Sequence, residues 1–106
     1  MRQAERHLRQ AVLEGELSVM MMIQEKSFNT GTVTVNYAEG PQNGPPLVLL
    51  HGLTLRWQVF LPLMPALAQR WYLFALDFRG HGKSGRVPGA YRGEDFSADT
   101  VKFLQE

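Results

Sequence analysis

The sequence predicts an α/β domain with a parallel sheet, and three features support this fold class. Residues 47–50 and 72–76 are apolar at every position, which is typical of strands buried on both faces of a parallel sheet. Between these strands, apolar residues recur at helical spacing from residue 57 to residue 68. Strand, helix and strand in this order form a right-handed βαβ unit. We therefore expect a β-hairpin followed by βαβ units.

Residues 1–17 are expected to form an N-terminal amphipathic helix ahead of the main unit, residues 18–106. Its apolar residues fall near one helical stripe: Ala4, Leu8, Ala11, Val12, Leu13 and Leu17. Gly15 is expected to end the regular part. The Arg residues resemble those of a transit peptide, but Glu5, Glu14 and Glu16 argue against one. The three methionines at 20–22 leave open a second translation start, which would make this helix an appendage.

The remaining elements follow in order along the chain. Residues 19–26 and 32–37 are predicted to be the strands of the hairpin, joined by a turn at residues 29–31. Residues 41–46 contain three prolines and are expected to form a loop. A glycine-rich loop follows the strand at 72–76 and extends through Gly89, and residues 96–104 begin another helix.

Composition excludes several classes of function. The chain has 106 residues, with 11 Lys and Arg against 10 Asp and Glu, so its formal net charge is +1. This balance gives no support to a nucleic-acid or membrane partner. Cysteine is absent, which excludes disulfides and thiolate metal sites and favours a reducing, cytoplasmic compartment. We expect neither a cofactor nor a metal ion.

Two polar segments follow the two buried strands, at the strand ends where α/β sheets bind ligands. The first is HGLT, residues 51–54, and the second is DFRGHGKS, residues 77–84. The second segment also resembles a phosphate-binding loop, but that motif requires glycine where Asp77 stands and a helix directly afterwards. Its Asp, Arg, His and Ser side chains share one tight loop, whereas a catalytic triad draws on separate strand ends. We therefore expect this loop to be structural.

Together, LVLLHG followed by a Trp-bearing helix and a strand leading into D-x-R-G-H-G-x-S resembles the α/β-hydrolase superfamily over residues 18–106. The resemblance implies that Gly52 and the backbone N–H of Leu53 contribute to an oxyanion hole, which stabilises the charge of a tetrahedral intermediate. It implies supporting rather than catalytic roles for a further set of residues: His51, Asp77, Arg79, Gly80, His81, Gly82 and Ser84.

The family places its nucleophile on a G-x-S-x-G elbow, and this sequence contains no such motif. No member of a triad is therefore assigned, and we expect the N-terminal portion of a hydrolase that is inactive by itself. Thr54 stands where many epoxide hydrolases and haloalkane dehalogenases of the family carry Pro. This difference favours hydrolysis of a small-molecule ester, a lactone or a carbon–carbon bond by a Ser nucleophile in the full-length protein.

The alternative is a non-catalytic module that assembles through an exposed sheet edge. In the family's topology the strands lie in the order first, second, fourth, third, so the strand at residues 47–50 forms an edge. An uncharged apolar edge is a template for strand pairing. We therefore expect self-association or pairing with the C-terminal part.

Overall fold

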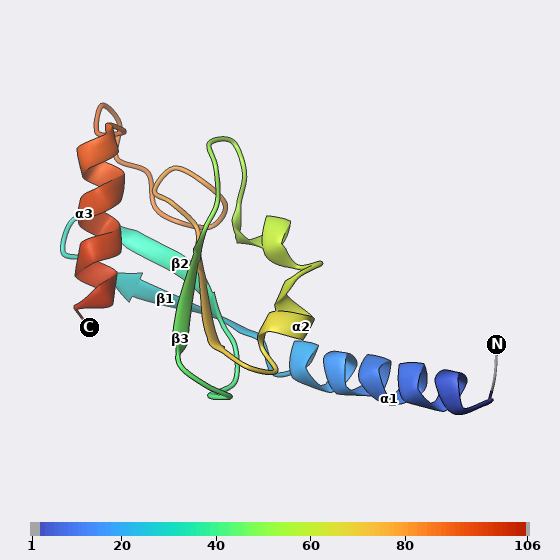
Figure 1. The fold of residues 1–106 in the computed structure, drawn as a ribbon. Helices are drawn as coiled ribbons and strands as arrows, with labels where there is room; N and C mark the ends of the chain where they lie inside the picture. Colours follow the sequence, from blue (N-terminus) through green and yellow to red (C-terminus); the bar gives the residue numbers. More distant parts are fainter. Residues whose placement is uncertain (1–2, 106) are drawn as a thin grey trace.

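The computed structural model describes residues 3–105, apart from the side chains of residues 8, 11–13 and 16. A long helix projects from a body in which helices flank a four-stranded sheet (Figure 1). The elements are α1 (Gln3–Met20), β1 (Gln24–Asn29), β2 (Thr34–Glu39), β3 (Pro46–Leu50), the 3₁₀ helix η1 (Trp57–Phe60), α2 (Met64–Leu67), β4 (Tyr72–Leu76) and α3 (Gly93–Leu104). Within this described part, no helix is both long and apolar enough to cross a bilayer.

The strand order is β1-β2-β4-β3, which confirms the predicted order. β1 and β2 form the antiparallel hairpin, and β2 also pairs antiparallel with β4. β3 and β4 are parallel, with Leu50 opposite Leu76. The carboxyl ends of these two strands therefore lie side by side, and the polar segments that follow them begin at the same edge of the sheet.

Apolar side chains cover both faces of the sheet. One core contains Trp57, Met64, Ala68, Leu73 and Ala75, with the partly buried Leu47 and Leu49 packed against it. The core on the opposite face joins alternate strand residues to α3: Val33, Val35 and Leu76 are buried, and Val48, Phe74 and Phe103 pack against them. This alternation is the two-residue period of strands sandwiched between helices. β4 is largely buried, whereas β3 at the edge is only partly covered.

The helix predicted at residues 57–68 is broken in the structure. The chain forms one short 3₁₀ helix, η1, and then the single turn α2. Pro62 and Pro65 explain the break, because proline lacks the N–H that a continuous helix needs and clashes with the preceding turn. Trp57, Met64 and Ala68 are buried, and Phe60, Leu61 and Leu67 are partly buried against the same core. The prediction was therefore right about which face is covered but wrong about helical continuity.

The predicted boundaries near the N-terminus were also wrong. α1 continues through Gly15 to Met20, so the first two residues of the strand predicted at residues 19–26 are helical. Val19 is buried in the core beside α2 as a helical residue. β1 therefore begins only at Gln24, and β2 runs from Thr34 to Glu39. The predicted stripe residues Leu8, Ala11, Val12 and Leu13 lie outside the described side chains.

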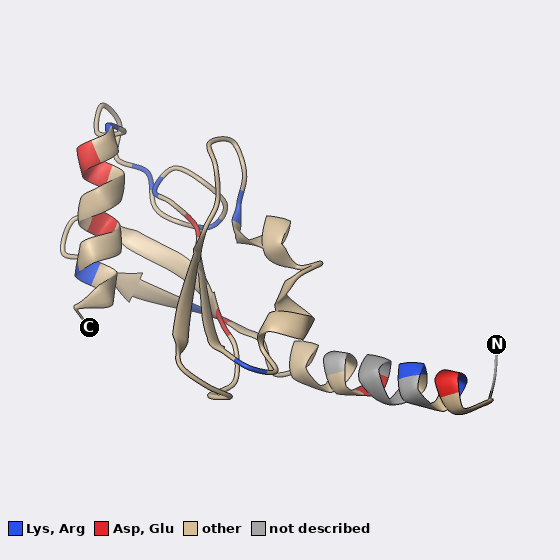
Figure 2. Cartoon of the chain, viewed as in Figure 1, with Lys and Arg blue, Asp and Glu red and all other residues tan. Residues whose placement is uncertain are grey.

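α3 begins at Gly93, three residues earlier than predicted, and its charges follow the helix dipole. Glu94 and Asp95 lie in its first turn and Lys102 lies in its last (Figure 2). Negative charge near a helix N-terminus and positive charge near its C-terminus are both stabilising. The Asp95 carboxylate also accepts the backbone N–H of Arg92 at 2.9 Å, which caps the helix and lowers the pKa of Asp95. The loop that precedes α3 is thereby held in place.

Candidate functional site

His51 connects the two loops that leave β3 and β4. Its ring is buried, its Nε2 accepts the backbone N–H of Phe78 at 3.0 Å, and its Nδ1 lies 2.6 Å from the Gly52 carbonyl oxygen. Since Nε2 accepts a hydrogen bond, and the carbonyl oxygen beside Nδ1 can only accept one, the ring proton lies on Nδ1. Both ring nitrogens are occupied by backbone groups, so His51 has no free nitrogen with which to act as a base.

Gly52, Leu53, Thr54 and Leu55 form a tight turn directly after His51. The Leu55 N–H donates to the Gly52 carbonyl at 3.3 Å, and Thr54 has a φ of +66°. A positive φ at the third position defines a type II turn, which ordinarily requires glycine there. A β-branched residue in this conformation is strained. Sequence reasoning did not identify this strain, because nothing in the residue type Thr indicates a left-handed backbone.

Leu53 occupies the second position of this turn. Its side chain is 70% exposed. Among the residues that the structure describes, no acceptor is hydrogen-bonded to the Leu53 backbone N–H. The turn therefore presents an unoccupied donor at the carboxyl edge of the parallel strands, beside the segment that follows β4.

Asp77 lies in the interior, at the end of β4. Its Oδ1 accepts the Trp57 backbone N–H at 2.7 Å. Its Oδ2 accepts the Asn36 side-chain amide at 3.0 Å and the Lys83 backbone N–H at 3.1 Å. A Cβ at Gly82 would overlap this carboxylate, and the φ of Gly82 is +51°, so only glycine fits there. Asp77 thus joins β2, η1 and the glycine-rich loop.

Ser84 closes the same loop against the sheet. Its buried hydroxyl donates to the Asp77 carbonyl at 2.7 Å and accepts the Asn36 backbone N–H at 2.8 Å. Both hydrogen-bonding roles of the hydroxyl are used, so Ser84 is not poised as a nucleophile. Asn36 is central to this arrangement, yet sequence patterns did not indicate it, because its partners lie 41 and 48 residues away.

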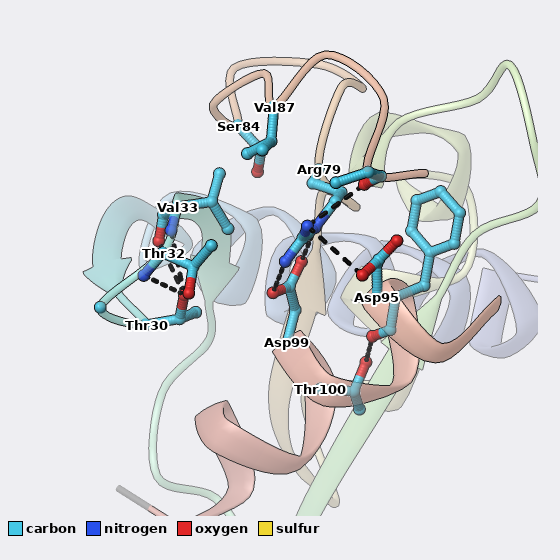
Figure 3. Close-up of polar contacts among 12 residues, drawn as sticks. Thr30, Thr32, Val33, Arg79, Ser84, Val87, Asp95, Asp99 and Thr100 are labelled. Carbon is cyan, nitrogen blue, oxygen red and sulfur yellow. Dashed lines mark hydrogen bonds and ion pairs between the residues drawn. The ribbon is translucent and has the colours of Figure 1, made fainter. Parts of the chain in front are cut away.

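Arg79 anchors the loop to α3 through a buried ion pair. Its Nε and Nη2 donate to the two carboxylate oxygens of Asp99 at 2.7 and 2.6 Å, and its Nη1 donates to the Ala90 carbonyl at 3.2 Å (Figure 3). Asp95 lies beyond, 4.0 Å from Nη1. The hydrogen bonds to Asp99 raise the pKa of Arg79 above its ordinary value. This guanidinium is fully engaged within the protein.

A second polar cluster ties β1 to the same region. Glu25 accepts hydrogen bonds from the Asn36 amide at 3.0 Å, from Lys83 Nζ at 3.0 Å and from the Trp57 indole at 3.2 Å. The bond from Asn36, followed by that from Lys83, lowers the pKa of Glu25. Sequence reasoning assigned no role to Glu25 or Trp57 in the loop, because their contact depends on the packing of distant segments.

Gly80 and His81 form the tip of the loop. Gly80 has a φ of +75°, and a Cβ there would lie 2.6 Å from the Tyr91 ring. The His81 Nδ1 lies 3.0 Å from the Arg79 carbonyl oxygen, and its ring centroid is 5.2 Å from that of His51. The other ring nitrogen of His81 has no hydrogen bond within the described residues.

An open groove of about 740 Å³ separates the two loops, with Thr54, Arg56 and Gln58 on one side and Gly80, His81 and Gly82 on the other. It lies where ligands bind in open α/β sheets, beyond the carboxyl ends of the strands. Among the described side chains, no group of three or more His, Asp or Glu residues is placed to hold a metal ion.

Comparison with known proteins agrees with this architecture. Residues 45–106 match the family model for the alpha/beta hydrolase fold. The chain belongs to the α/β-hydrolase family. A solved structure of E-2-(acetamidomethylene)succinate hydrolase superposes with a TM-score of 0.73 at 31% identity, covering 78% of this chain and 31% of that one. The predicted fold class and family are thereby confirmed.

Curated relatives of this α/β-hydrolase chain include enzymes with different substrates. The 2-(acetamidomethylene)succinate hydrolase of Mesorhizobium japonicum is 38% identical over 80 residues, which are 76% of this chain and 28% of the relative. Epoxide hydrolase B of Mycobacterium tuberculosis is 40% identical over 79 residues, which are 70% of this chain and 22% of the relative. The chain thus spans about a quarter of the length of these two relatives, and both are named as hydrolases.

Proposed function

We propose that this α/β-hydrolase chain supplies one oxyanion-hole donor, the backbone N–H of Leu53, to a hydrolytic site whose nucleophile lies elsewhere in the whole protein. The observation that carries the proposal is the unoccupied Leu53 N–H at the edge of the parallel strands. A tetrahedral intermediate places negative charge on the former carbonyl oxygen. A preorganised N–H donor stabilises that charge by about 3 kcal/mol.

The surrounding contacts support preorganisation of this donor. His51 binds the Gly52 carbonyl on one side and the Phe78 N–H on the other, so the start of the turn is fixed to the loop after β4. The Leu55 N–H closes the turn from its other end. A donor that is already oriented needs little reorganisation when charge develops. In this proposal, Gly52 and Leu53 act on the substrate, and His51 holds their geometry.

We further propose that the substrate is a small molecule with an ester, a lactone or a hydrolysable carbon–carbon bond. Thr54 supports this choice, because its φ of +66° is a conformation that proline cannot adopt. The turn therefore differs from the loops of many epoxide hydrolases and haloalkane dehalogenases, which carry Pro at this position. The name of one relative, 2-(acetamidomethylene)succinate hydrolase, is consistent with acyl chemistry.

The experiment removes the donor without removing the turn. Proline is favoured at the second position of a type II turn, so Leu53→Pro deletes the N–H while suiting the backbone. In the product of the complete gene, we expect kcat for an ester substrate to fall about 10²- to 10³-fold. The matched variant Leu53→Ala keeps the N–H and should retain most activity. Equal activity of the two variants would refute the role of Leu53.

The 106-residue chain alone provides a second measurement. Because its sequence contains no G-x-S-x-G elbow, we expect no hydrolysis of p-nitrophenyl acetate above that of an inactive protein. Saturable turnover that a serine-directed inhibitor abolishes would contradict this expectation. It would place a nucleophile within the chain itself.

A specific observation also favours a second candidate, assembly through the edge of the sheet. β3 is the edge strand, and its last residue, Leu50, is 44% exposed. An apolar edge with unpaired backbone groups is a template for another strand. Leu50→Lys and Val48→Lys should both reduce the mass measured by light scattering if the chain associates through β3. A cooperatively folding monomer of the unmodified chain at high concentration would exclude this candidate.

A further inference from the structure

The groove between the two loops contains a cation that no internal group neutralises. Arg56 lines the groove and is exposed. Within the described part of the chain, its guanidinium forms no ion pair and no hydrogen bond. Figure 2 shows basic residues in both loops, before η1 and after β4.

The charges around Arg56 are engaged elsewhere. Lys83 is paired with Glu25 at 3.0 Å, and Arg79 is paired with Asp99 at 2.6 Å. The Asp77 carboxylate lies behind Gly82 and accepts three N–H donors of the scaffold. Within the described residues, no ion pair joins Asp77 to Arg56. The guanidinium remains available to an anion that enters the groove.

Two neighbouring residues show the same lack of internal partners. Gln58 also lines the groove, and its Oε1 is buried without a hydrogen-bond donor, which ordinarily costs free energy. Thr54 lines the groove in a strained conformation, and its hydroxyl has no hydrogen bond within the described residues. Strain and unsatisfied polar groups in natural proteins often mark sites of function. Here both occur on one wall of one groove.

We propose that this groove is a carboxylate subsite in which Arg56 binds an acidic group of the substrate. The proposal rests on the proposed function, since it names the substrate class of the same site. The groove begins at Thr54, the residue that follows Leu53. Arg56 is three residues from Leu53, so their Cα atoms lie no more than about 11 Å apart. A half-ester of a short dicarboxylic acid carries an ester and a carboxylate in one small molecule, so we choose it as the ligand that tests this subsite. Guanidinium groups bind carboxylates through paired hydrogen bonds, which suits this assignment.

The experiment measures binding rather than turnover. The ¹⁵N-labelled chain is titrated with monomethyl succinate at constant ionic strength, and amide shifts are followed at groove residues such as Leu55, Val59 and Gly82. Dimethyl succinate, which has the same carbon skeleton plus one methyl group but no charge, is the ligand control. We expect saturable shifts with the monoester and at least about tenfold weaker binding of the diester, equivalent to about 1.4 kcal/mol.

Variants then assign the site to one side chain. Arg56→Gln should raise the Kd of monomethyl succinate about tenfold, whereas Arg56→Lys should raise it less. Arg70→Gln is the matched control, because Arg70 is exposed and lies before β4, at the opposite end of the strand. Removing that charge should leave the Kd unchanged. The proposal is refuted if the two Gln variants bind alike, if the diester binds as well as the monoester, or if no saturable shift is seen.

These outcomes are separable from those of the proposed function. Carboxylate binding at Arg56 is measured in a chain that need not turn over any substrate. If Leu53→Pro leaves hydrolysis by the complete gene product intact, the oxyanion-hole role fails while the Kd comparison still stands. If Arg56→Gln leaves the Kd unchanged, the substrate class fails while the Leu53 experiment still stands.

Discussion

The buried pair of Arg79 and Asp99 should dominate the stability of the loop that carries His81. Asp99→Asn keeps the shape of the side chain but removes the charge that two guanidinium N–H groups contact at 2.6 and 2.7 Å. The side chains of Arg79 and Asp99 are 4% and 5% exposed, so water cannot replace the lost carboxylate charge, and the nearest remaining carboxylate, Asp95, lies 4.0 Å from Nη1. Breaking such a pair costs about 3–5 kcal/mol. Domains of this size unfold with about 5–15 kcal/mol, so the loss is a large fraction of the total.

Urea denaturation followed by far-ultraviolet circular dichroism measures this loss, and thermal unfolding should show a fall in Tm of at least about 12 °C. Glu94→Gln is the control, because the ion pair of Glu94 with Arg92 is exposed and should contribute less than about 1 kcal/mol. Replacing both partners, as Arg79→Met with Asp99→Leu, should cost less than Asp99→Asn alone, because no charge is then left buried. Equal destabilisation by Asp99→Asn and Glu94→Gln would refute the reasoning.

Two further predictions concern strain and pH. Thr54→Gly should stabilise the chain by about 0.5–1 kcal/mol, because relief of the left-handed strain exceeds the added entropy of the unfolded chain. Thr54→Val keeps the β-branched side chain and should give no gain in stability. A lower Tm for the Gly variant than for the unmodified chain would contradict the strain at Thr54. Since the pKa of Glu25 is lowered in the folded chain, its stabilisation is complete above about pH 4.3 and is lost as the pH falls through the folded value. The difference in unfolding free energy between the unmodified chain and Glu25→Gln, measured by urea titration, should therefore be constant from pH 5.5 to 7 and change only at lower pH. A difference that stays constant down to pH 3 would contradict the lowered pKa of Glu25.

Local patterns predicted the parts of this fold that depend on local physics. The apolar segments at 47–50 and 72–76 form parallel strands, and their sequence separation requires the crossover that η1 and α2 provide. The errors have equally local causes. Pro62 and Pro65 divide the helical segment, because proline lacks the N–H that a continuous helix needs. Gly15 lies inside α1, because a single glycine lowers helix propensity by only about 1 kcal/mol and does not by itself end a helix.

The polar contacts were less predictable, because each joins residues far apart in sequence. Asn36 meets Asp77 across 41 residues, and Glu25 meets Lys83 across 58. Neither residue belongs to a motif that could be read along the chain. The strained Thr54 was equally hidden, since a turn that requires a positive φ ordinarily contains glycine.

Whether a polar group already has a hydrogen-bond partner distinguishes structural residues from candidate functional residues better than residue type does. Asp77, Arg79 and Ser84 resemble catalytic groups by name, but Asp77 and Ser84 are committed to the protein's own backbone and side chains. Arg79 is committed to Asp99. Leu53 and Arg56 look ordinary by name, yet the donors they present at the strand ends have no partner within the described residues. Because buried polar groups are costly to leave unpaired, the loops use their most polar residues to hold their shape. The donors that have no partner within the described residues, the Leu53 N–H and the Arg56 guanidinium, are the ones available to a substrate.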